Sequence, residues 1–532
     1  MHSIELIIAL LAVVTILAEV AGRIKLPYPI LLVLVGMALG LVPGLPRVAL
    51  APDLVFLLFL PPLLYAAAWG TSWPDFKAAR RPIGLLALGC VLFTTGLVAV
   101  VAHWLIPGFS WPVAFVLGAI ISPPDAVAAT SATKGLALPR RVVTVLEGES
   151  LVNDATGLIA YRYAVAAVLT GQFVLWQAGL QLLWVASAGV GIGLLIGWGV
   201  FRLHRLTRNP VVDTSLTFLT PYLAYLAAEE LHVSGVLAVV AAGLFLARRS
   251  ARIFAHEARL QTYAVWNTIV LLLNGVVFIL IGLELPVILA DIEGASFWAA
   301  LGYGLLISLT VVVGRLLWVY PGTYLPRWLS RTIREQELRP PIPMVTVVAW
   351  TGMRGVVSLA AALALPLTLR PGVPFPHRNL LLFITFVVIF CTLVGQGLSL
   401  VPLIRWLGIR PDNSAEREEA EVRLHLATET AAYLTSSASA GQAPTDVLAR
   451  MQNRYEIRLE RLRNRLAGVR ASRLDEKPIT QFQQLQEAVI RFERSVIEQL
   501  RDEEKTSEEV LRKLENELDL EEARLALDKV RG

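Results

Sequence analysis

Acidic and amide side chains interrupt an otherwise apolar segment in the stretch Leu146-Glu147-Gly148-Glu149-Ser150-Leu151-Val152-Asn153-Asp154-Ala155, which continues as an almost wholly apolar run to residue 170. A carboxylate placed at membrane depth costs about 2.5–3.5 kcal/mol on insertion scales. A chain tolerates this cost where the charge meets a partner or lines an ion pathway. We therefore expect this stretch to lie at the functional centre of the protein.

The rest of the chain is also strongly apolar, with 55% hydrophobic and 17% charged residues and a mean hydropathy of +0.62. Such a composition indicates an all-α polytopic membrane protein rather than a soluble enzyme. Apolar runs near the roughly 20 residues that cross a bilayer recur through the first three quarters of the chain. They predict thirteen membrane-spanning helices, at residues 3–22, 28–43, 53–70, 83–106, 112–133, 141–170, 178–203, 212–230, 233–248, 262–286, 296–320, 341–368 and 378–404.

Basic residues fall in alternate loops between these spans, whereas the opposite loops carry little beyond Arg47, Arg370 and Arg378. Because basic loops stay in the cytoplasm, this alternation predicts an external N-terminus and a cytoplasmic C-terminus. The net charge of +5 then reflects membrane topology. Nucleic-acid binding would need a basic face on a soluble domain, which the sequence lacks.

Two of the predicted spans contain residues that break helices. The fifth holds Ile121-Ser122-Pro123-Pro124-Asp125-Ala126, and the twelfth holds Trp350-Thr351-Gly352-Met353-Arg354-Gly355. Consecutive prolines and paired glycines unwind a helix, which at membrane depth is tolerated only inside protein or beside an aqueous cavity. Broken helices at corresponding positions of two halves indicate inverted repeats with a binding site at the midplane. Asp125 and Arg354 have the signs needed to neutralise the broken helix ends.

The stretch 146–155 is then predicted to form part of an ion site. On a helix, Glu149 and Asn153 share one face, and Ser150 and Asp154 form the adjacent pair. Asp154 offers an anionic oxygen, Ser150 and Asn153 offer neutral ones, and the Pro124 backbone carbonyl adds another. Such oxygen ligands suit an alkali cation such as sodium, held by Asp154 and Ser150, better than a transition metal.

Asp154 can hold either a cation or a proton, and burial favours its protonated form. Competition between the two for one carboxylate is sufficient for exchange by alternating access, and the cycle is electroneutral if Glu149 stays ionised throughout. A buried Glu149 remains charged only with a partner. Arg315 is the first candidate because it too lies in a long apolar span, and Arg354 is the alternative.

The sequence lacks the motifs expected of other functional classes. The chain has two cysteines, Cys90 and Cys391, both within predicted spans, and no zinc motif or phosphate-binding loop, so we expect no cofactor and no use of ATP. A cation channel gated by the tail would need a filter motif, and an intramembrane hydrolase would need a Ser/His or paired-Asp constellation. The leading hypothesis is a non-enzymatic sodium/proton antiporter, with a potassium/proton antiporter as the alternative.

The composition changes after Trp406, which divides the chain into a membrane domain (1–410) and a charged helical tail (411–532). In the tail, Leu511, Leu514, Leu518 and Leu525 recur at helical spacings, which predicts packing through one face and a possible coiled coil. The tail either solubilises the protein and supports a dimer, or acts as a regulatory sensor.

These motifs resemble the monovalent cation:proton antiporter-1 family, and the bacterial sodium/proton exchangers in particular. The resemblance rests on Glu147-Gly148-Glu149-Ser150-Leu151-x-Asn153-Asp154, on Ser-Pro-x-Asp-Ala-Val at 122–127, on Arg354-Gly355, and on the tail run 518–524. It implies a homodimer in a bacterial inner membrane, a six-helix transport bundle that moves against a scaffold, and a role in pH homeostasis. It also implies that Asp154 binds ion and proton, that Asn153 and Ser150 assist, that Glu149 pairs with Arg315, and that Asp125 and Arg354 attend crossed broken helices.

The sequence departs from the family pattern at two positions. Many members carry Thr immediately before the Asp of the fifth span, where this chain has Pro124. Some members place an acidic residue after the Leu-Pro-Pro-Leu-Leu-aromatic run of the third span, where this chain has Ala66 after Tyr65. Both changes remove a side-chain oxygen from the expected ion site.

Overall fold

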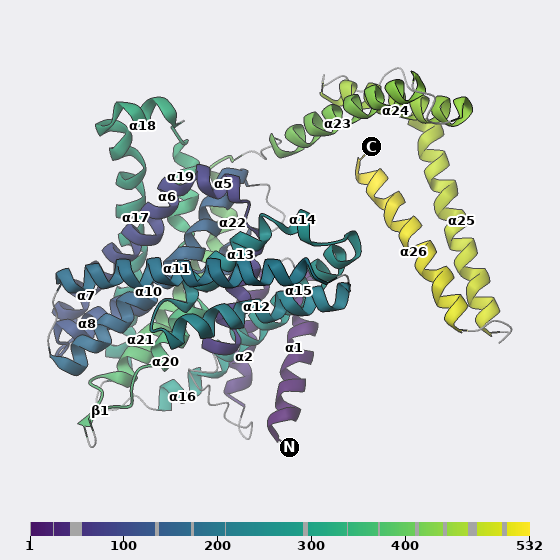
Figure 1. Cartoon of the computed structure of the whole chain (residues 1–532). Coiled ribbons are helices and arrows are strands. Elements are labelled where there is room, and N and C mark those ends of the chain that lie inside the picture. The colour runs from purple at the N-terminus through teal and green to yellow at the C-terminus, as the bar shows by residue number, and fades with distance from the viewer. Residues whose placement is uncertain are drawn as a thin grey trace. The chain divides into compact units, whose positions relative to one another are not determined.

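The computed structural model describes residues 2–24, 26–42, 56–133, 138–171, 175–207, 209–290, 296–337, 339–370, 373–409, 414–439, 444–466, 476–502 and 508–531. The chain forms two compact units, Met1–Pro411 and Asp412–Gly532, and helices dominate both (Figure 1). Among the described residues one short antiparallel pair of strands, β1 (Thr368–Arg370) and β2 (Val373–Pro374), follows the twelfth predicted span.

Each of the thirteen predicted spans contains helix. The first six correspond to α1 (His2–Ile24), α2 (Tyr28–Gly40), α4 (Leu60–Gly70), α6 (Arg80–Gly84) with α7 (Val91–Leu105), α8 (Trp111–Ile121) with α9 (Ala126–Ala132), and α10 (Arg140–Thr170). The others correspond to α11 (Leu175–His204), α12 (Pro210–Glu230), α13 (Gly235–Ala247), α15 (His256–Leu283), α17 (Phe297–Leu329), α19 (Ile342–Trp350) with α20 (Val356–Leu363), and α21 (Arg378–Phe390) with α22 (Gly397–Trp406). Short helices α5 (Trp73–Ala78), α14 (Ser250–Ile253), α16 (Leu285–Ala290) and α18 (Arg331–Gln336) connect them.

By length and composition alone, fewer helices qualify as membrane spans. Within the described residues, five helical segments are long and apolar enough to cross a bilayer, at Arg80–Leu105, Gly179–His204, Glu257–Leu283, Phe297–Leu329 and Arg378–Trp406. Four shorter apolar helices accompany them. The broken helices and the polar α10 fall outside such a criterion because their prolines and carboxylates interrupt the apolar run. The total of thirteen spans stays a prediction.

The fifth and twelfth spans are both interrupted. Helix α8 ends at Ile121 and α9 begins at Ala126, while α19 ends at Trp350 and α20 begins at Val356. Pro123 and Pro124 have no amide hydrogen to continue the ladder of α8. The second gap holds Gly352 and Gly355, which lower the cost of irregular backbone.

The two interrupted spans lie in the largest buried core of the membrane unit. Its members come from α8, α20 and α21 among others, including Val116, Ile120, Ala361 and Ile384. Helix α10 packs against α8 on one side and against α6 on another. Because Gly118 of α8 lies against the backbone of Thr95, where a Cβ would overlap the Thr95 carbonyl oxygen, α7 and α8 approach closely. This packing holds the breaks beside the carboxylates of α10.

Two π-helical segments, which the sequence analysis did not predict, interrupt the fourth and thirteenth spans. They are Leu85–Cys90, between α6 and α7, and Cys391–Gln396, between α21 and α22. Single π turns inside α-helices often occur at functional sites. The second segment carries Thr392, whose hydroxyl contacts the broken twelfth span.

The tail unit contains α23 (Ser414–Ser439), α24 (Thr445–Leu466), α25 (Glu476–Asp502) and α26 (Glu508–Arg531). Helix α23 packs against α24, and α25 packs against α26 as a hairpin (Figure 1). Leu511, Leu518 and Leu525 are buried against Ile490 and Ile497 of α25. The inclusion of Leu514 in this face is wrong, because its side chain is 39% exposed. The seven-residue spacing of the other three leucines matches packing against a single neighbouring helix.

Candidate functional site

Arg354 reaches from the break in the twelfth span to the break in the fifth. Its Nε donates to the carbonyl oxygen of Ile121 at 2.8 Å, and its Nη2 donates to that of Ser122 at 3.3 Å. Both oxygens lie at the C-terminal end of α8, where carbonyls have no partner within the helix and carry partial negative charge. The Arg354 side chain, 1% exposed, therefore caps α8 with a positive charge, and it also donates to the Gly352 carbonyl.

Asp125 occupies the N-terminal end of α9. Its carboxylate accepts a hydrogen bond from the Val127 amide at 2.8 Å, and its own amide donates to the Met353 carbonyl at 2.7 Å. Gly355, which directly precedes α20, lies against the same carboxylate. A negative charge is favourable at helix N-termini, so Asp125 serves two half-helices at once.

The contact between Gly355 and Asp125 leaves no room for a methyl group. A Cβ at residue 355 would overlap the Asp125 carboxylate, so we expect Gly355→Ala to lower stability by about 1–3 kcal/mol through overpacking and to reduce transport. Thermal unfolding in detergent and ion flux in proteoliposomes measure the two effects. Gly96→Ala on α7, where a Cβ meets nothing within 4 Å, is the matched control and should behave as wild type. Equal stability of the two variants would contradict the assignment.

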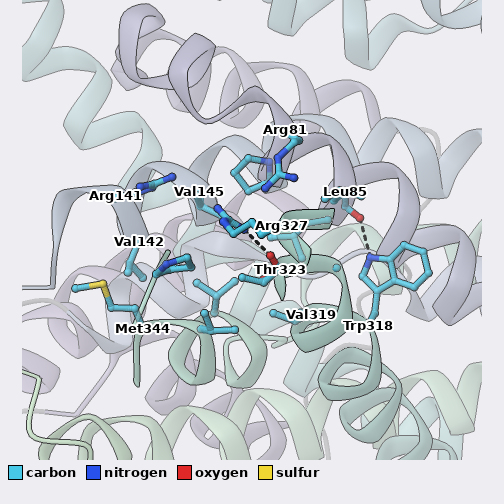
Figure 2. A pocket seen from close by; sticks show the side chains of 16 residues that line it. Arg81, Leu85, Arg141, Val142, Val145, Trp318, Val319, Thr323, Arg327 and Met344 are labelled. Carbon is cyan, nitrogen blue, oxygen red and sulfur yellow. Dashed lines mark hydrogen bonds between the residues drawn. The ribbon is translucent and has the colours of Figure 1, made fainter. Parts of the chain in front are cut away.

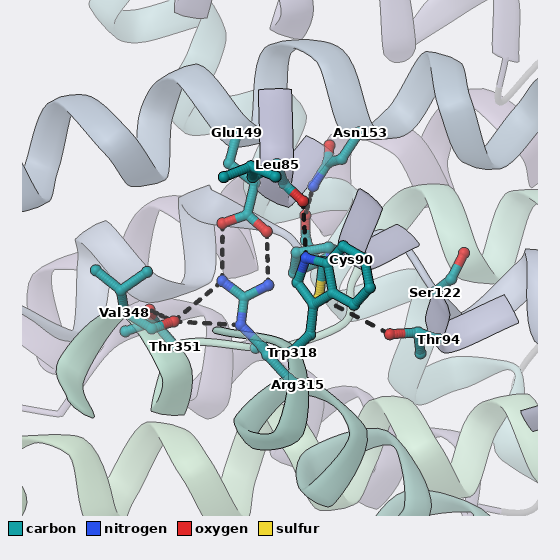
Figure 3. A network of polar contacts seen from close by, with 12 residues as sticks. Leu85, Cys90, Thr94, Ser122, Glu149, Asn153, Arg315, Trp318, Val348 and Thr351 are labelled. Atoms are coloured by element: carbon teal, nitrogen blue, oxygen red, sulfur yellow. Dashed lines mark hydrogen bonds and ion pairs between the residues drawn. The ribbon is translucent and has the colours of Figure 1, made fainter. Parts of the chain in front are cut away.

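Glu149 and Arg315 form a two-pronged ion pair between α10 and α17 (Figure 3). Arg315 Nη1 donates to Glu149 Oε1 at 2.5 Å, and Nη2 donates to Oε2 at 2.7 Å. The remaining donors of the guanidinium reach the Val348 carbonyl at 3.1 and 3.2 Å. Both side chains are almost completely buried, at 2% and 1% exposure. The partner of Glu149 is thus Arg315, whereas the alternative, Arg354, is engaged with the carbonyls of α8.

Asn153 links α10 to the break in the fifth span. Its Nδ2 donates to the Pro124 carbonyl oxygen at 2.7 Å, while its buried Oδ1 has no hydrogen-bond partner among the described residues. A carbonyl oxygen has two lone pairs, so the Pro124 oxygen keeps one acceptor position after binding Asn153. Pro124 lies between the end of α8 and the beginning of α9, so its carbonyl belongs to the irregular backbone of the break.

Several predicted site residues surround one small cavity of about 180 Å³. Its lining comprises Pro124, Asp125, Ala129, Leu146, Glu149, Ser150, Asn153 and Thr351. The structure therefore brings together the neutral oxygens of Ser150 and Pro124 with the amide of Asn153. Asp154 is not among the lining residues, although it follows Asn153 directly and is 8% exposed.

Asp154 differs from the other two carboxylates of the site, the buried Glu149 and the half-buried Asp125. Glu149 is fixed by Arg315, and Asp125 is bound by a backbone amide of α9. Asp154 has no hydrogen-bond or ion-pair partner within the described part of the chain, and the charge of Asp125 acts on it unfavourably. A buried carboxylate without a fixed partner gains most from binding either a proton or a cation.

Two threonines of the site were missed by the sequence analysis. Thr351 lines the cavity, and its hydroxyl donates to the Val347 carbonyl at 2.9 Å. Thr392 accepts a hydrogen bond from the Arg354 amide at 3.1 Å. Threonines are frequent in these spans, where most bond to their own helix, as Thr95 and Thr156 do. In the sequence, only its position inside the break distinguishes Thr351 from the other threonines of these spans.

Comparison with known proteins identifies the chain. A family model described as the transmembrane region of sodium/hydrogen exchangers matches residues 7–406, which include both broken helices and the three carboxylates of the site. The chain belongs to the sodium/hydrogen exchanger family. Like the other members, it is a helical membrane protein that exchanges cations for protons.

Relatives with similar sequences span most of the chain. An uncharacterised Na+/H+ exchanger of Mycobacterium tuberculosis is 33% identical over 533 residues, covering 98% of this exchanger and 95% of the relative. One from Escherichia coli is 30% identical and covers 97% and 98%. A sodium, potassium, lithium and rubidium/H+ antiporter of Bacillus subtilis is 35% identical over 404 residues, which are 74% of this chain and 60% of that antiporter.

The fold has a counterpart among solved structures. The sodium proton antiporter MjNhaP1 of Methanocaldococcus jannaschii, determined at pH 8, matches with a TM-score of 0.58 at 20% sequence identity. The match covers 77% of this exchanger and 99% of that chain. It shows that the membrane unit has the antiporter fold.

Proposed function

We propose that this exchanger moves sodium against protons by alternating access, with both ions competing for Asp154. The observation that carries the proposal is the contrast among the three carboxylates of the site. Arg315 neutralises Glu149, the N-terminal end of α9 stabilises Asp125, and Asp154 has no fixed partner in the described part of the chain. A site whose only exchangeable carboxylate binds one cation or one proton couples the two fluxes.

Neutral oxygens complete the proposed cation site. Asn153 holds the Pro124 carbonyl through its Nδ2, which leaves the Asn153 Oδ1 and one Pro124 lone pair available. Ser150 lies one helical turn before Asp154 and lines the neighbouring cavity. Sodium prefers such oxygen ligands. Asp154 and Ser150 supply the side-chain oxygens, and Pro124 supplies a backbone oxygen in place of a hydroxyl.

Potassium is the second candidate cation. The relative from Bacillus subtilis is named for sodium, potassium, lithium and rubidium, and Pro124 and Ala66 leave this chain fewer side-chain ligands to enforce a small coordination shell. Proton flux in proteoliposomes, measured after separate addition of sodium, lithium, potassium or choline, tests the choice. A response to sodium and lithium above potassium supports sodium. No response to any alkali cation relative to choline would overturn the proposal.

Exchange of one monovalent cation for one proton moves no net charge. Glu149, Arg315, Asp125 and Arg354 keep their charges in this scheme because each is bound to partners inside the protein. One elementary charge crossing the membrane changes the driving force by about 2.3 kcal/mol per 100 mV.

We therefore expect the initial rate of sodium/proton exchange to be independent of an imposed membrane potential. The rate is measured in proteoliposomes at fixed sodium and pH gradients, with the potential set by a lipophilic ion. An ionophore that carries protons electrogenically serves as the positive control for the potential. A strong dependence of the exchanger on voltage would contradict one-for-one stoichiometry.

The cellular setting extends the same proposal. We assign the exchanger to a bacterial inner membrane on the basis of its bacterial relatives. Its N-terminus lies outside and its tail in the cytoplasm, because basic loops alternate along the sequence. We also propose that the exchanger forms a homodimer and contributes to pH homeostasis. Cross-linking in native membranes tests the dimer, and labelling of single cysteines introduced at the two termini tests the orientation.

A further inference from the structure

A second cavity, which shares no lining residue with the small cavity of the ion site, lies where the ends of four helices meet (Figure 2). It is bounded by the beginnings of α6, α10 and α19 and by the last turns of α17. About 700 Å³ of space, counted out to the open solvent at its mouth, is free of protein atoms. The transport scheme does not use it.

Three arginines gather at this cavity. Arg81, Arg141 and Arg327 line it together (Figure 2), and the charges of Arg81 and Arg141 both repel that of Arg327. Among the described residues Glu337 is the carboxylate paired with them, accepting hydrogen bonds from Arg81 and Arg327 at 2.7 Å each. A single carboxylate balances one of the three guanidinium charges, so the cluster keeps a positive excess.

The guanidinium groups also hold unused hydrogen-bond donors. Arg327 is 9% exposed, and its Nε has no partner among the described residues. The same is true of Nε and Nη1 of Arg81. Leaving buried donors of a charged group unsatisfied is unfavourable, and a planar guanidinium matches the oxygens of a phosphate or carboxylate. The three guanidinium groups therefore have the charge and the free donors needed to bind an anion.

Apart from Thr323, the rest of the lining is apolar. Val142 and Val145 of α10 face Met344, Val345 and Val348 of α19, with Leu85, Leu86 and Val319 nearby. The indole N–H of Trp318 donates a hydrogen bond to the Leu85 carbonyl at 2.9 Å. Beneath the arginines the walls thus offer surface for a hydrocarbon chain rather than for a polar metabolite.

We propose that this pocket binds an acidic phospholipid of the surrounding bilayer. The phosphate accepts hydrogen bonds from Arg81, Arg141 and Arg327, and part of an acyl chain lies against Val142, Val145 and Met344. The occupant bridges α10 and α19, the helices that carry Glu149 and the Val348 carbonyl bound by Arg315. A lipid would thereby reinforce the packing that holds the buried ion pair.

Two substitutions separate the contributions of charge and shape. Arg141 is exposed and makes no hydrogen bond or ion pair with other described residues, so Arg141→Gln removes a charge without breaking the Glu337 contacts of its neighbours. Gly322 lines the pocket on α17, and a Cβ there would come no closer than 3.8 Å to Trp318. Gly322→Leu therefore fills the space without a backbone clash. Gly302→Leu on the same helix, where a Cβ meets nothing within 4 Å, is the matched control.

Native mass spectrometry of the delipidated full-length protein in a neutral detergent measures binding. Phosphatidylglycerol, phosphatidylcholine and inorganic phosphate are titrated separately. We expect wild type and Gly302→Leu to prefer phosphatidylglycerol over phosphatidylcholine, Arg141→Gln to bind it about fivefold more weakly, and Gly322→Leu to lose this preference. Equal binding of both lipids by wild type, unchanged binding by Gly322→Leu, or phosphate binding as tight as that of the lipid would each overturn the proposal.

Discussion

Asp154→Asn is expected to reduce cation/proton exchange to the level of protein-free liposomes while the protein stays folded. Asparagine is nearly isosteric with aspartate but carries no charge and releases no proton, so it can neither hold the cation nor couple it to proton movement. Because Asp154 has no partner among the described residues, its replacement breaks no ion pair. Proton flux driven by a sodium gradient in proteoliposomes measures the loss.

The neighbouring carboxylate Glu147 provides the matched control for Asp154. It lies on the same helix, and the structure gives it no hydrogen bond within the described residues. Glu147→Gln should therefore exchange at close to the wild-type rate, and size-exclusion profiles should show that both variants are folded. If Asp154→Asn exchanged as fast as Glu147→Gln, the carboxylate at position 154 would not be the coupling group.

The second large effect concerns stability. Arg315→Ala leaves the Glu149 carboxylate buried without its partner, and breaking a buried ion pair in this way costs about 3–5 kcal/mol. We expect a markedly lower yield of folded protein and a lower unfolding temperature in detergent. In the fraction that folds, cation preference should change less than yield does, because Arg315 does not line the small cavity beside the ion site.

A double variant distinguishes charge from packing at the same place. Glu149→Leu combined with Arg315→Met removes both charges and keeps apolar side chains of similar reach, a replacement that is often neutral or stabilising for a buried pair. Its unfolding temperature should exceed that of Arg315→Ala. If Arg315→Ala alone were as stable as wild type, the pair would have no structural role.

Local residues were enough to predict the two helix breaks. Pro123 and Pro124 cannot continue the hydrogen-bond ladder, so the end of α8 at Ile121 follows from the chain itself. The signs of Asp125 and Arg354 likewise indicated which helix ends each would serve. The exchanger fold followed from these motifs in combination, and the comparisons confirm the family.

Features that depend on how distant helices meet could not be predicted. Arg315 was already the first candidate partner of Glu149 in the sequence, but its two-pronged geometry and its contact with the Val348 carbonyl depend on the placement of α17. The sequence pattern did not indicate the contact between the Thr392 hydroxyl and the Arg354 amide, nor the two π-helical segments. Leu514 shows the same limit in the tail, since spacing alone did not reveal which leucines face α25.

Proton release on sodium binding tests the central claim most directly. Purified exchanger in weakly buffered detergent solution, at a pH where the site begins protonated, is mixed with saturating sodium chloride, and the pH change is compared with that from choline chloride. The account predicts about one proton released per chain by wild type and none by Asp154→Asn, since one carboxylate exchanges one ion for the other. Equal release from both proteins, or none from an active wild type, would contradict it.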